Sequence, residues 1–130
     1  MLRDLKLIRY SILKSSYKSK EGHIGSSFSI LEIIYVIFKY HFKDNYFIIS
    51  KGHASIGIYT VLNFFKYLSN KTLNSFCNFN SKLGGHPDST KLPLLNFSTG
   101  SLGHGLPNST GLAYALKLKK SKKKVICLLG

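Results

Sequence analysis

The sequence predicts an α/β fold, a piece of a parallel-sheet domain with helices on both faces. Two short segments, Tyr46–Ser50 and Lys124–Gly130, carry the apolar residues that are typical of buried strands. Most of the remaining apolar residues recur at helical spacing. Strands that are separated by helices are joined by crossover connections, which favour a parallel sheet. Two strands do not make a finished domain, so we expect the sheet to be incomplete.

The first half of the chain predicts two helices before the first strand. Apolar residues at helical spacing predict an amphipathic helix from Leu2 to about Lys18, which the glycines of the EGHIGSS segment should end. Ser29 has Glu32 three residues later, the pattern of a capping box. This pattern predicts that Ser29 begins the second helix, Ile30–Tyr40, whose sides are mostly apolar and should therefore be buried.

After the first strand the pattern becomes helical again. We expect a turn at KGHAS, a helix over Ala54–Leu68 and a short helix over Thr72–Asn78. Glycines and prolines predict a long loop over Asn80–Asn96, and loops of this length are usually functional or disordered. A last helix is expected over Asn108–Lys119, with Pro107 near its first turn.

The chain is strongly basic, with 19 Lys and Arg against 5 Asp and Glu, a net charge of +14. Only Arg3 and Arg9 are arginines, and the lysines are spread out except in the run Lys117–Lys124. Sequence-specific nucleic-acid readers rely on the arginine fork, so we expect no specific nucleic-acid partner. The charge then either coats a solvated surface or attracts anionic substrates or an acidic partner chain.

No segment predicts a membrane span or a secretion signal. The best candidate span, Phe28–Phe38, is far shorter than the roughly 18 apolar residues required, and it contains Glu32. The N-terminus lacks the apolar core and cleavage site of a signal peptide. We therefore expect a cytoplasmic protein with no membrane partner. Cys77 and Cys127 have neither metal-ligand nor disulfide-framework spacing.

Four of the five histidines lie next to a glycine in a predicted turn: His23 in GHIG, His53 in KGHAS, His86 in GGHP and His104 in SLGHG. Turns at strand ends are where α/β proteins place their ligands. A histidine there can donate to a phosphate, a hydroxyl or an oxyanion, and the glycine lets backbone approach the ligand. A single such histidine is usually only solvated, but four together indicate a site. His41 lacks this context.

Other kinds of site fit these residues less well. The histidines show no short ligand pair such as H-x-x-x-H, so no metal site is predicted. Neither cysteine lies in a glycine turn, which disfavours a Cys–His hydrolase. GSLGHG is neither a dinucleotide-binding fingerprint nor a Walker loop. Several histidines in acid-poor glycine turns favour a phosphorylated substrate or cofactor.

Together these motifs resemble the N-terminal part of the transketolase family, which uses thiamine diphosphate. GHIGSSFSILEI resembles the family's first histidine loop and following helix, DNYFIISKGHASIGIY its second loop, and KLGGHPD its third. STGSLGHGL resembles its cofactor-facing glycine loop, and GLAYAL and VICLLG the helix and strand that follow. The KGHAS and GGHP pair favours transketolase over the deoxyxylulose-phosphate synthase branch. The resemblance implies a three-layer, parallel-sheet thiamine diphosphate-binding domain, of which residues 1–130 form a part.

The resemblance also implies which glycine-loop residues bind the cofactor. The backbone of Gly100, Ser101 and Leu102 is implied to pack against the aminopyrimidine ring of thiamine diphosphate. Small uncharged residues would let the backbone reach the ring without a competing ion. His104 is a further implied cofactor-binding residue, and it stands where many family members carry Gln.

Three histidines are implied to be catalytic. His23 and His86 would line the sugar channel. His53 would lie near the cofactor diphosphate and the reacting centre, and would bind the cofactor as well.

The implied activity is transfer of a two-carbon ketol unit between sugar phosphates, as in the pentose phosphate pathway, with thiamine diphosphate and Mg²⁺. In the family, an Asp directly after the LLG strand and a later Asn bind the magnesium, and a Glu of a separate pyrimidine domain activates the cofactor. None of these lies in residues 1–130, so we expect no metal ligand here and an inactive chain alone, whether a fragment, a decayed gene or one part of a split enzyme. The expected partner is a homodimer mate or a second transketolase subunit that carries the pyrimidine domain.

Two alternatives stay open at this point. One is a transketolase-like enzyme that acts on an unusual or activated sugar, for instance in surface polysaccharide synthesis. The other is a non-catalytic basic module in which the lysine run Lys117–Lys124 binds nucleic acid.

Overall fold

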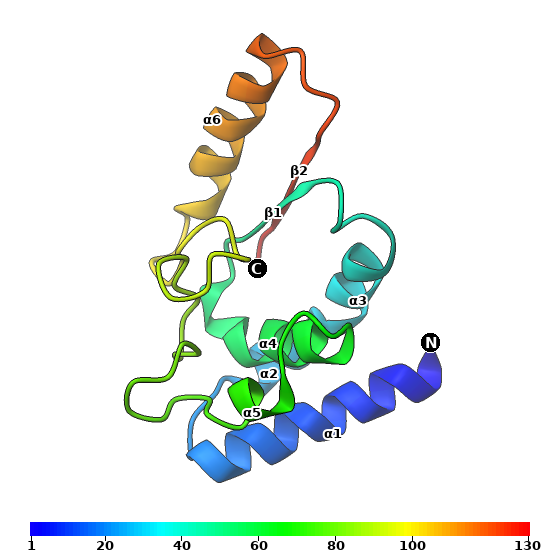
Figure 1. Ribbon diagram of the computed structural model, residues 1–130, viewed down its shortest axis with the longest axis vertical. Helices are drawn as coiled ribbons and strands as arrows, with labels where there is room; N and C mark the ends of the chain where they lie inside the picture. The colour runs from blue at the N-terminus through cyan, green and yellow to red at the C-terminus, as the bar shows by residue number, and fades with distance from the viewer.

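The computed structural model describes all of residues 1–130 (Figure 1). The elements run in the order α1 (Leu2–Ser19), α2 (Ile24–Phe28), α3 (Leu31–Tyr40), β1 (Tyr46–Ile49), a 3₁₀ turn η1 (Gly52–Ala54), α4 (Ser55–Phe64), α5 (Asn70–Leu73), α6 (Gly105–Leu118) and β2 (Val125–Leu128). No helix is both long and apolar enough to cross a membrane.

The two strands form a parallel pair, in which Tyr46 lies opposite Val125 and Ile49 opposite Leu128. Successive strand residues point to opposite faces of a sheet. Phe47 and Ile49 pack into the main hydrophobic core with the first helices, whereas Ile48 is buried outside that core. Helix α6 contacts both strands and extends away from the other helices (Figure 1). The arrangement is a helix–sheet–helix sandwich, which confirms the predicted α/β class and its parallel sheet.

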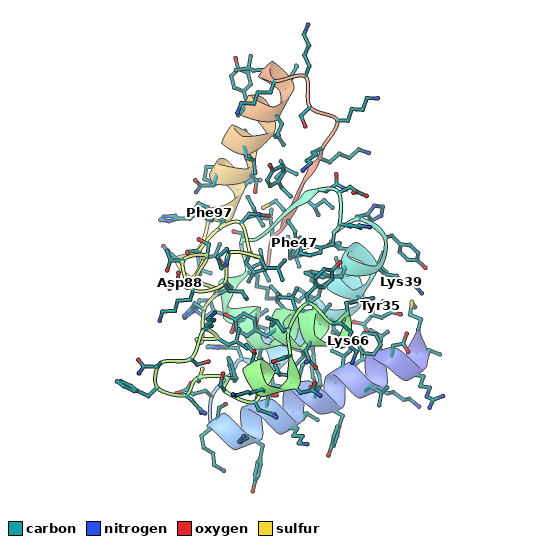
Figure 2. All side chains as sticks on the ribbon, viewed as in Figure 1. Tyr35, Lys39, Phe47, Lys66, Asp88 and Phe97 are labelled. Atoms are coloured by element: carbon teal, nitrogen blue, oxygen red, sulfur yellow. The ribbon has the colours of Figure 1, made fainter.

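Helix α4 lies at the centre of the main core. Its residues from Ser55 to Leu62 are all buried, and α1, α2, α3 and α5 pack around it. From β1, Phe47 reaches the same core and makes an edge-on contact with Phe38 of α3, with ring centroids 5.4 Å apart (Figure 2). The loops that precede and follow α4 are therefore held by a rigid, fully packed element.

The structure corrects the predicted start of the second helix. Ser29 does not cap α3: its hydroxyl donates to the carbonyl of Ser26, and the N-cap residue is Ile30, with no side-chain hydrogen bond. Glu32 pairs instead with Arg9 of α1. The capping-box prediction was wrong because Ser29 belongs to the end of α2, a one-turn helix that occupies most of the segment predicted as a break.

The boundaries of the later helices also differ from the prediction. Helix α4 ends at Phe64, four residues early, because Lys66 takes a left-handed conformation with φ of 67°. Helix α5 is shifted toward the N-terminus, where the hydroxyl of Ser69 accepts from the backbone N–H of Thr72. Helix α6 begins at Gly105 rather than Asn108, which a proline in the first turn permits. The predicted long loop is confirmed and is longer than expected, since no helix or strand lies between α5 and α6.

Candidate functional site

Three of the four glycine-flanked histidines meet beside the start of α4. The rings of His23 and His53 lie edge-on, with centroids 4.9 Å apart, and those of His53 and His86 do the same at 4.6 Å. His53 is half-buried in the 3₁₀ turn, and the other two are more exposed. Residues 30 or more positions apart in the chain therefore form one cluster, which we call the histidine cluster (His23, His53 and His86).

His23 is placed by close packing between α2 and α4. It is the N-cap residue of α2, which is too short to hold its own position. A buried serine, Ser27, lies against Gly57 of α4, where a Cβ would come within 2.9 Å of the serine Cβ. The Ser27 hydroxyl also accepts from the Gly57 backbone N–H at 3.2 Å. Only glycine lets the two helices approach so closely, and this approach brings His23 to His53.

His86 is placed by two hydroxyl groups of α4. Ser55 donates to the carbonyl of Gly85 at 2.7 Å, and the Tyr59 hydroxyl donates to the carbonyl of His86 itself at 3.3 Å. These residues are four positions apart and share one face of the helix. Burial raises the pKa of Tyr59, so its hydroxyl stays protonated and able to donate. The long loop is thus tied to the same helix that positions His53.

The glycine loop closes onto the histidine cluster. A Cβ at Gly52 would come within 2.8 Å of the backbone nitrogen of Gly100, and one at Gly100 within 3.2 Å of the His86 ring. The backbone N–H of Thr99 donates to the carbonyl of Pro87 at 3.1 Å. All four predicted motifs therefore contact one another in a chain that runs from His23 through His53 and His86 to Gly100.

Next to this contact lies an open hollow of about 210 Å³, lined by Ser98, Thr99, Gly100, Ser101 and His104. We call it the glycine-loop hollow. The lining contains no Lys, Arg, Asp or Glu. The hydroxyl of Thr99, a residue only 8% exposed, has no hydrogen-bond partner. Leu102 is 72% exposed beside the hollow. The sequence-predicted residues Ser101, Leu102 and His104 follow Gly100, which contacts His86, and all three are exposed.

The glycine-loop hollow lies at the carboxyl end of the sheet. Gly105, the first residue of α6, is packed so tightly against Ser50 at the end of β1 that a Cβ would come within 2.7 Å of the Ser50 Cα. Helix N-termini offer unpaired N–H groups and a positive dipole end, which favour anionic groups. The hollow is therefore lined by small residues without formal charge and lies beside the N-terminus of α6.

The histidine cluster contains no carboxylate. Partial burial, and then the neighbouring His53 and His23, lower the pKa of His86, so this ring is neutral at pH 7. Asp88, which lies on the long loop with Phe97 (Figure 2), is occupied by hydrogen bonds from the backbone and hydroxyl of Thr90. No group of three or more His, Cys, Asp or Glu side chains in residues 1–130 is arranged to hold a metal ion.

A second open hollow, of about 650 Å³, extends from His86 along the long loop to Glu21 and Cys77. Burial, followed by the charge of Glu21, raises the pKa of the Cys77 thiol. A thiol that stays protonated is a poor nucleophile, which disfavours a Cys–His hydrolase, as the sequence pattern does. His86 therefore borders this hollow as well as the glycine loop.

Several positioning residues were not predicted from the sequence. They are Gly52, Ser27, Gly57, Ser55, Tyr59 and Thr99. One signal was available for two of them, since Ser55 and Tyr59 place hydroxyls four residues apart on an otherwise apolar helix. Nothing in the sequence alone shows that Gly57 meets Ser27, because that contact joins two helices 30 residues apart.

Comparison with known proteins identifies the family. Residues 3–124 match the family described as "Transketolase, thiamine diphosphate binding domain". An apulose-4-phosphate transketolase subunit of Actinobacillus succinogenes is 36% identical, over 98% of this chain and 50% of that protein. Transketolase 1 of Pasteurella multocida is 34% identical, over 85% of this chain and 18% of that protein. The chain thus spans about half the length of the apulose-4-phosphate transketolase relatives and about a fifth of the longer transketolases.

Solved structures agree with the sequence matches. Transketolase from Pichia stipitis in complex with sedoheptulose-7-phosphate superposes with a TM-score of 0.82 at 26% identity, over 98% of this chain and 22% of that one. Transketolase from Campylobacter jejuni gives a TM-score of 0.81 at 28% identity, over 98% of this chain and 23% of that one. The resemblance inferred from the four loop motifs is confirmed, and the chain belongs to the transketolase thiamine diphosphate binding domain family.

Proposed function

We propose that this chain forms part of an enzyme that transfers a two-carbon ketol unit between sugar phosphates with thiamine diphosphate. Residues 1–130 would supply part of the diphosphate-binding domain. The observation that carries the proposal is the contact chain from His23 through His53 and His86 to Gly100. It joins a group of proton donors and acceptors to a small, uncharged hollow that backbone atoms can line.

The residues present fit the organic part of the cofactor. The glycine-loop hollow is small, neutral and lined by Gly100 and Ser101. Next to it the buried Thr99 hydroxyl has no partner. When bound, thiamine diphosphate supplies a carbon that can hold the electron pair of a cleaved C–C bond. Gly100, Ser101 and Leu102 would bind its aminopyrimidine ring, with His104 as a further donor.

The histidine cluster supplies the polar chemistry of the proposal. Because its pKa is lowered, His86 is neutral at pH 7 and can both accept and donate a proton at a sugar hydroxyl. His23, on the other side of His53, would contact the same sugar chain. His53, half-buried between them, would face the reacting centre and the diphosphate.

Magnesium is the part of the proposal that residues 1–130 do not supply. The segment from Ser89 to Gly130 contains no Asp or Glu, and Mg²⁺ prefers carboxylate, carbonyl and phosphate oxygens. We propose that a homodimer mate or a second transketolase subunit supplies the pyrimidine domain. We also propose a cytoplasmic location and, at most, weak and sequence-independent binding to nucleic acid.

We expect the polypeptide of residues 1–130 by itself to catalyse no ketol transfer and to bind magnesium–thiamine diphosphate more weakly than micromolar. Titration calorimetry with cofactor and magnesium measures the dissociation constant. A polypeptide joined to the acidic magnesium motif and a pyrimidine domain is the positive control. Micromolar or tighter binding by residues 1–130 contradicts this part of the proposal.

Substitution of His53 tests the catalytic assignment in the assembled enzyme. His53→Ala should lower turnover by about 10²–10³-fold, because a donor near developing charge acts mainly on the transition state. Cofactor affinity, measured by calorimetry, should change much less. His41→Ala is the matched control, since His41 lies at the C-terminus of α3 and outside the histidine cluster. If the two substitutions had equal effects on turnover, the assignment of His53 to the site would be wrong.

A second candidate substrate follows from the relatives. Two proteins that are 31% and 36% identical are named as apulose-4-phosphate transketolase subunits, so apulose-4-phosphate is a second candidate substrate. Rates with apulose-4-phosphate and with xylulose-5-phosphate as ketol donors distinguish the two. A preference for the common ketose excludes this second candidate.

A further inference from the structure

Lys51 differs from every other lysine of the chain in its burial. Sixteen of the 17 lysines are exposed, whereas Lys51 is half-buried. Lysine side chains are rarely taken out of water without a partner or a role. Lys51 is the first residue of the KGHAS motif, two positions before His53. Its burial arises from contacts within residues 1–130, so any further segment can only add to it.

The Lys51 side chain lies across the carboxyl ends of both strands. Lys51 is the second residue after β1, and Gly130 is the second residue after β2. A Cβ at Gly130 would overlap Cγ and Cδ of Lys51 and would come within 2.9 Å of its Cε. The alkyl stem of Lys51 therefore passes directly over the end of β2, and a residue with a side chain at position 130 would block this path.

A hydroxyl group at the end of α2 holds the ammonium. The Lys51 Nζ donates to the Oγ of Ser29 at 3.0 Å, and the same Ser29 Oγ donates to the carbonyl of Ser26 at 2.9 Å. Because the hydroxyl proton of Ser29 points to Ser26, a lone pair of the oxygen faces Lys51. An ammonium has three N–H donors, so two remain after this bond. Ser29 thus fixes the ammonium without using up its donors.

The ammonium lies at the edge of the sheet where proteins of this class bind ligands. Ligands of open α/β sheets bind outside the carboxyl ends of the strands. Lys51 shares its turn with His53 and with Gly52, which packs against the backbone of Gly100. The residue therefore belongs to the turn that joins the histidine cluster to the glycine loop.

An anionic group is the ligand that this ammonium fits. Lys51 forms no ion pair with any of the five Asp and Glu side chains in residues 1–130. A lysine ammonium binds phosphate as a compact point charge. The proposed reaction brings two such groups, the diphosphate of the cofactor and the phosphate of the sugar. The diphosphate is favoured because Lys51 shares its turn with His53, assigned to the diphosphate, and not with His86, assigned to the sugar.

We propose that Lys51 is a cofactor-binding residue whose ammonium contacts the diphosphate of thiamine diphosphate, with Ser29 and Gly130 as its positioning residues. This inference rests on the proposed function, which supplies the cofactor. Gly130 lets the stem cross the end of β2, and Ser29 holds the ammonium with two N–H groups left for phosphate oxygens. Residues 1–130 then offset part of the diphosphate charge themselves, in addition to the magnesium ion.

The experiment measures the affinity of the assembled enzyme, with magnesium, for thiamine diphosphate and for thiamine by titration calorimetry. Lys51→Met keeps an unbranched stem and removes the charge. It should weaken the binding of thiamine diphosphate by about 10–100-fold, because hydrogen bonds to charged groups are among the strongest. The affinity for thiamine, which has no phosphate, should stay within about twofold. Lys51→Arg, which keeps the charge, should retain more affinity than Lys51→Met.

The matched control is Lys43→Met. Lys43 is an exposed lysine before the start of β1, at the opposite end of the strand from Lys51. This substitution removes the same charge from the chain, so it should change neither affinity if only the local contact matters. An equal loss of thiamine diphosphate affinity in Lys43→Met would mean that overall charge acts, and it overturns the proposal.

Ser29→Ala tests whether the hydroxyl acts through Lys51. This variant should weaken the binding of thiamine diphosphate less than Lys51→Met does, because the ammonium is still present. The double variant should bind no more weakly than Lys51→Met alone, since residues that act through one contact are not additive. Additive losses would show that Ser29 does not position Lys51, and they overturn its assigned role.

The KM for the ketol donor separates the cofactor from the sugar. With saturating cofactor, Lys51→Met should leave this KM within about twofold of the unmodified enzyme, because the proposal places no sugar contact at Lys51. A raised KM with unchanged cofactor affinity would assign the ammonium to the sugar phosphate and overturns the proposal. Equal losses of affinity for thiamine and for thiamine diphosphate would show a merely structural role and overturn it as well.

The outcomes also separate this inference from the proposed function. If Lys51→Met binds the cofactor as tightly as the unmodified enzyme and transfers ketol groups, the assignment of Lys51 is wrong and the function stands. If cofactor affinity depends on Lys51 but no ketol group is transferred, the assignment stands and the reaction is wrong. If the unmodified assembled enzyme does not bind thiamine diphosphate, both are overturned.

Discussion

Helices α4 and α6 both carry several apolar residues but have very different surroundings. In α4, every residue from Ser55 to Leu62 is buried, and four other helices surround it. In α6, only Gly105 and Ser109 are buried. A hydrophobic pattern states that a face must be covered, but it does not state what covers it. The helices of residues 1–130 cover α4, whereas the outer face of α6 is exposed in these residues.

The same contrast runs through the candidate site. The loops that α4 positions carry the histidine cluster, whose members contact one another directly. The residues just before α6, among them Leu102 and His104, are exposed. The half of the site on α4 is therefore preorganised within this chain. The half beside α6 is open in residues 1–130.

Truncation of one leucine in each helix gives the largest expected difference. Leu62 of α4 is fully buried, and Leu62→Ala should lower the free energy of unfolding by about 2–5 kcal/mol through lost burial and a cavity. Leu118→Ala on the outer face of α6 should change it by less than about 0.5 kcal/mol, because an exposed leucine loses little on truncation. Urea denaturation followed by circular dichroism measures both. A loss of about 2 kcal/mol or more at Leu118 would mean that this chain itself covers α6.

Substitution of a glycine near each helix compares how closely the backbone is packed in the two regions. Gly52→Ala should cost about 1–3 kcal/mol of unfolding free energy, because the new Cβ meets backbone atoms of Thr99 and Gly100 that cannot move aside. Gly111→Ala on α6 should instead stabilise the chain by about 0.5–1 kcal/mol, since it meets nothing and removes a helix-interior glycine. Both are read from urea midpoints. A neutral Gly52→Ala would show that the glycine loop does not pack on the 3₁₀ turn.

Much of the site could be predicted because its chemistry is local in sequence. Each histidine lies within a short glycine-containing motif, so the motif order alone indicated four loops of one family. The fold class followed from two β-branched segments separated by helical periodicity. Patterns formed by residues close together in the chain can be recognised in a single sequence.

The parts that failed depend on contacts between distant residues. Ser29 carries the capping-box pattern, but a one-turn helix lies directly before it, and Glu32 forms an ion pair with Arg9 instead of capping the helix. The Ser27–Gly57 and Gly52–Gly100 contacts join segments 30 or more residues apart, and a glycine in a loop gives no sign of which backbone it must approach. Local patterns locate the chemistry, and only the packing shows what holds it in place.

The smallest expected effect concerns how the free energy of unfolding depends on pH in the region of the histidine cluster. The folded chain lowers the pKa of His86 through burial and the neighbouring His53 and His23. In the unfolded chain the ordinary value of about 6.5 applies. As pH falls below that value, the unfolded state therefore binds the proton more readily, and the free energy of unfolding decreases. Above about pH 7.5 both states are neutral at this residue, and the contribution is constant.

His86→Gln should flatten this dependence between about pH 7.5 and pH 5, measured as the shift of the urea midpoint with pH. The effect is modest because water screens a ring that is largely exposed. An unchanged pH dependence in His86→Gln would show that this ring is not the source of the effect. The histidine cluster around α4 would then not be the electrostatically coupled unit that its ring contacts indicate.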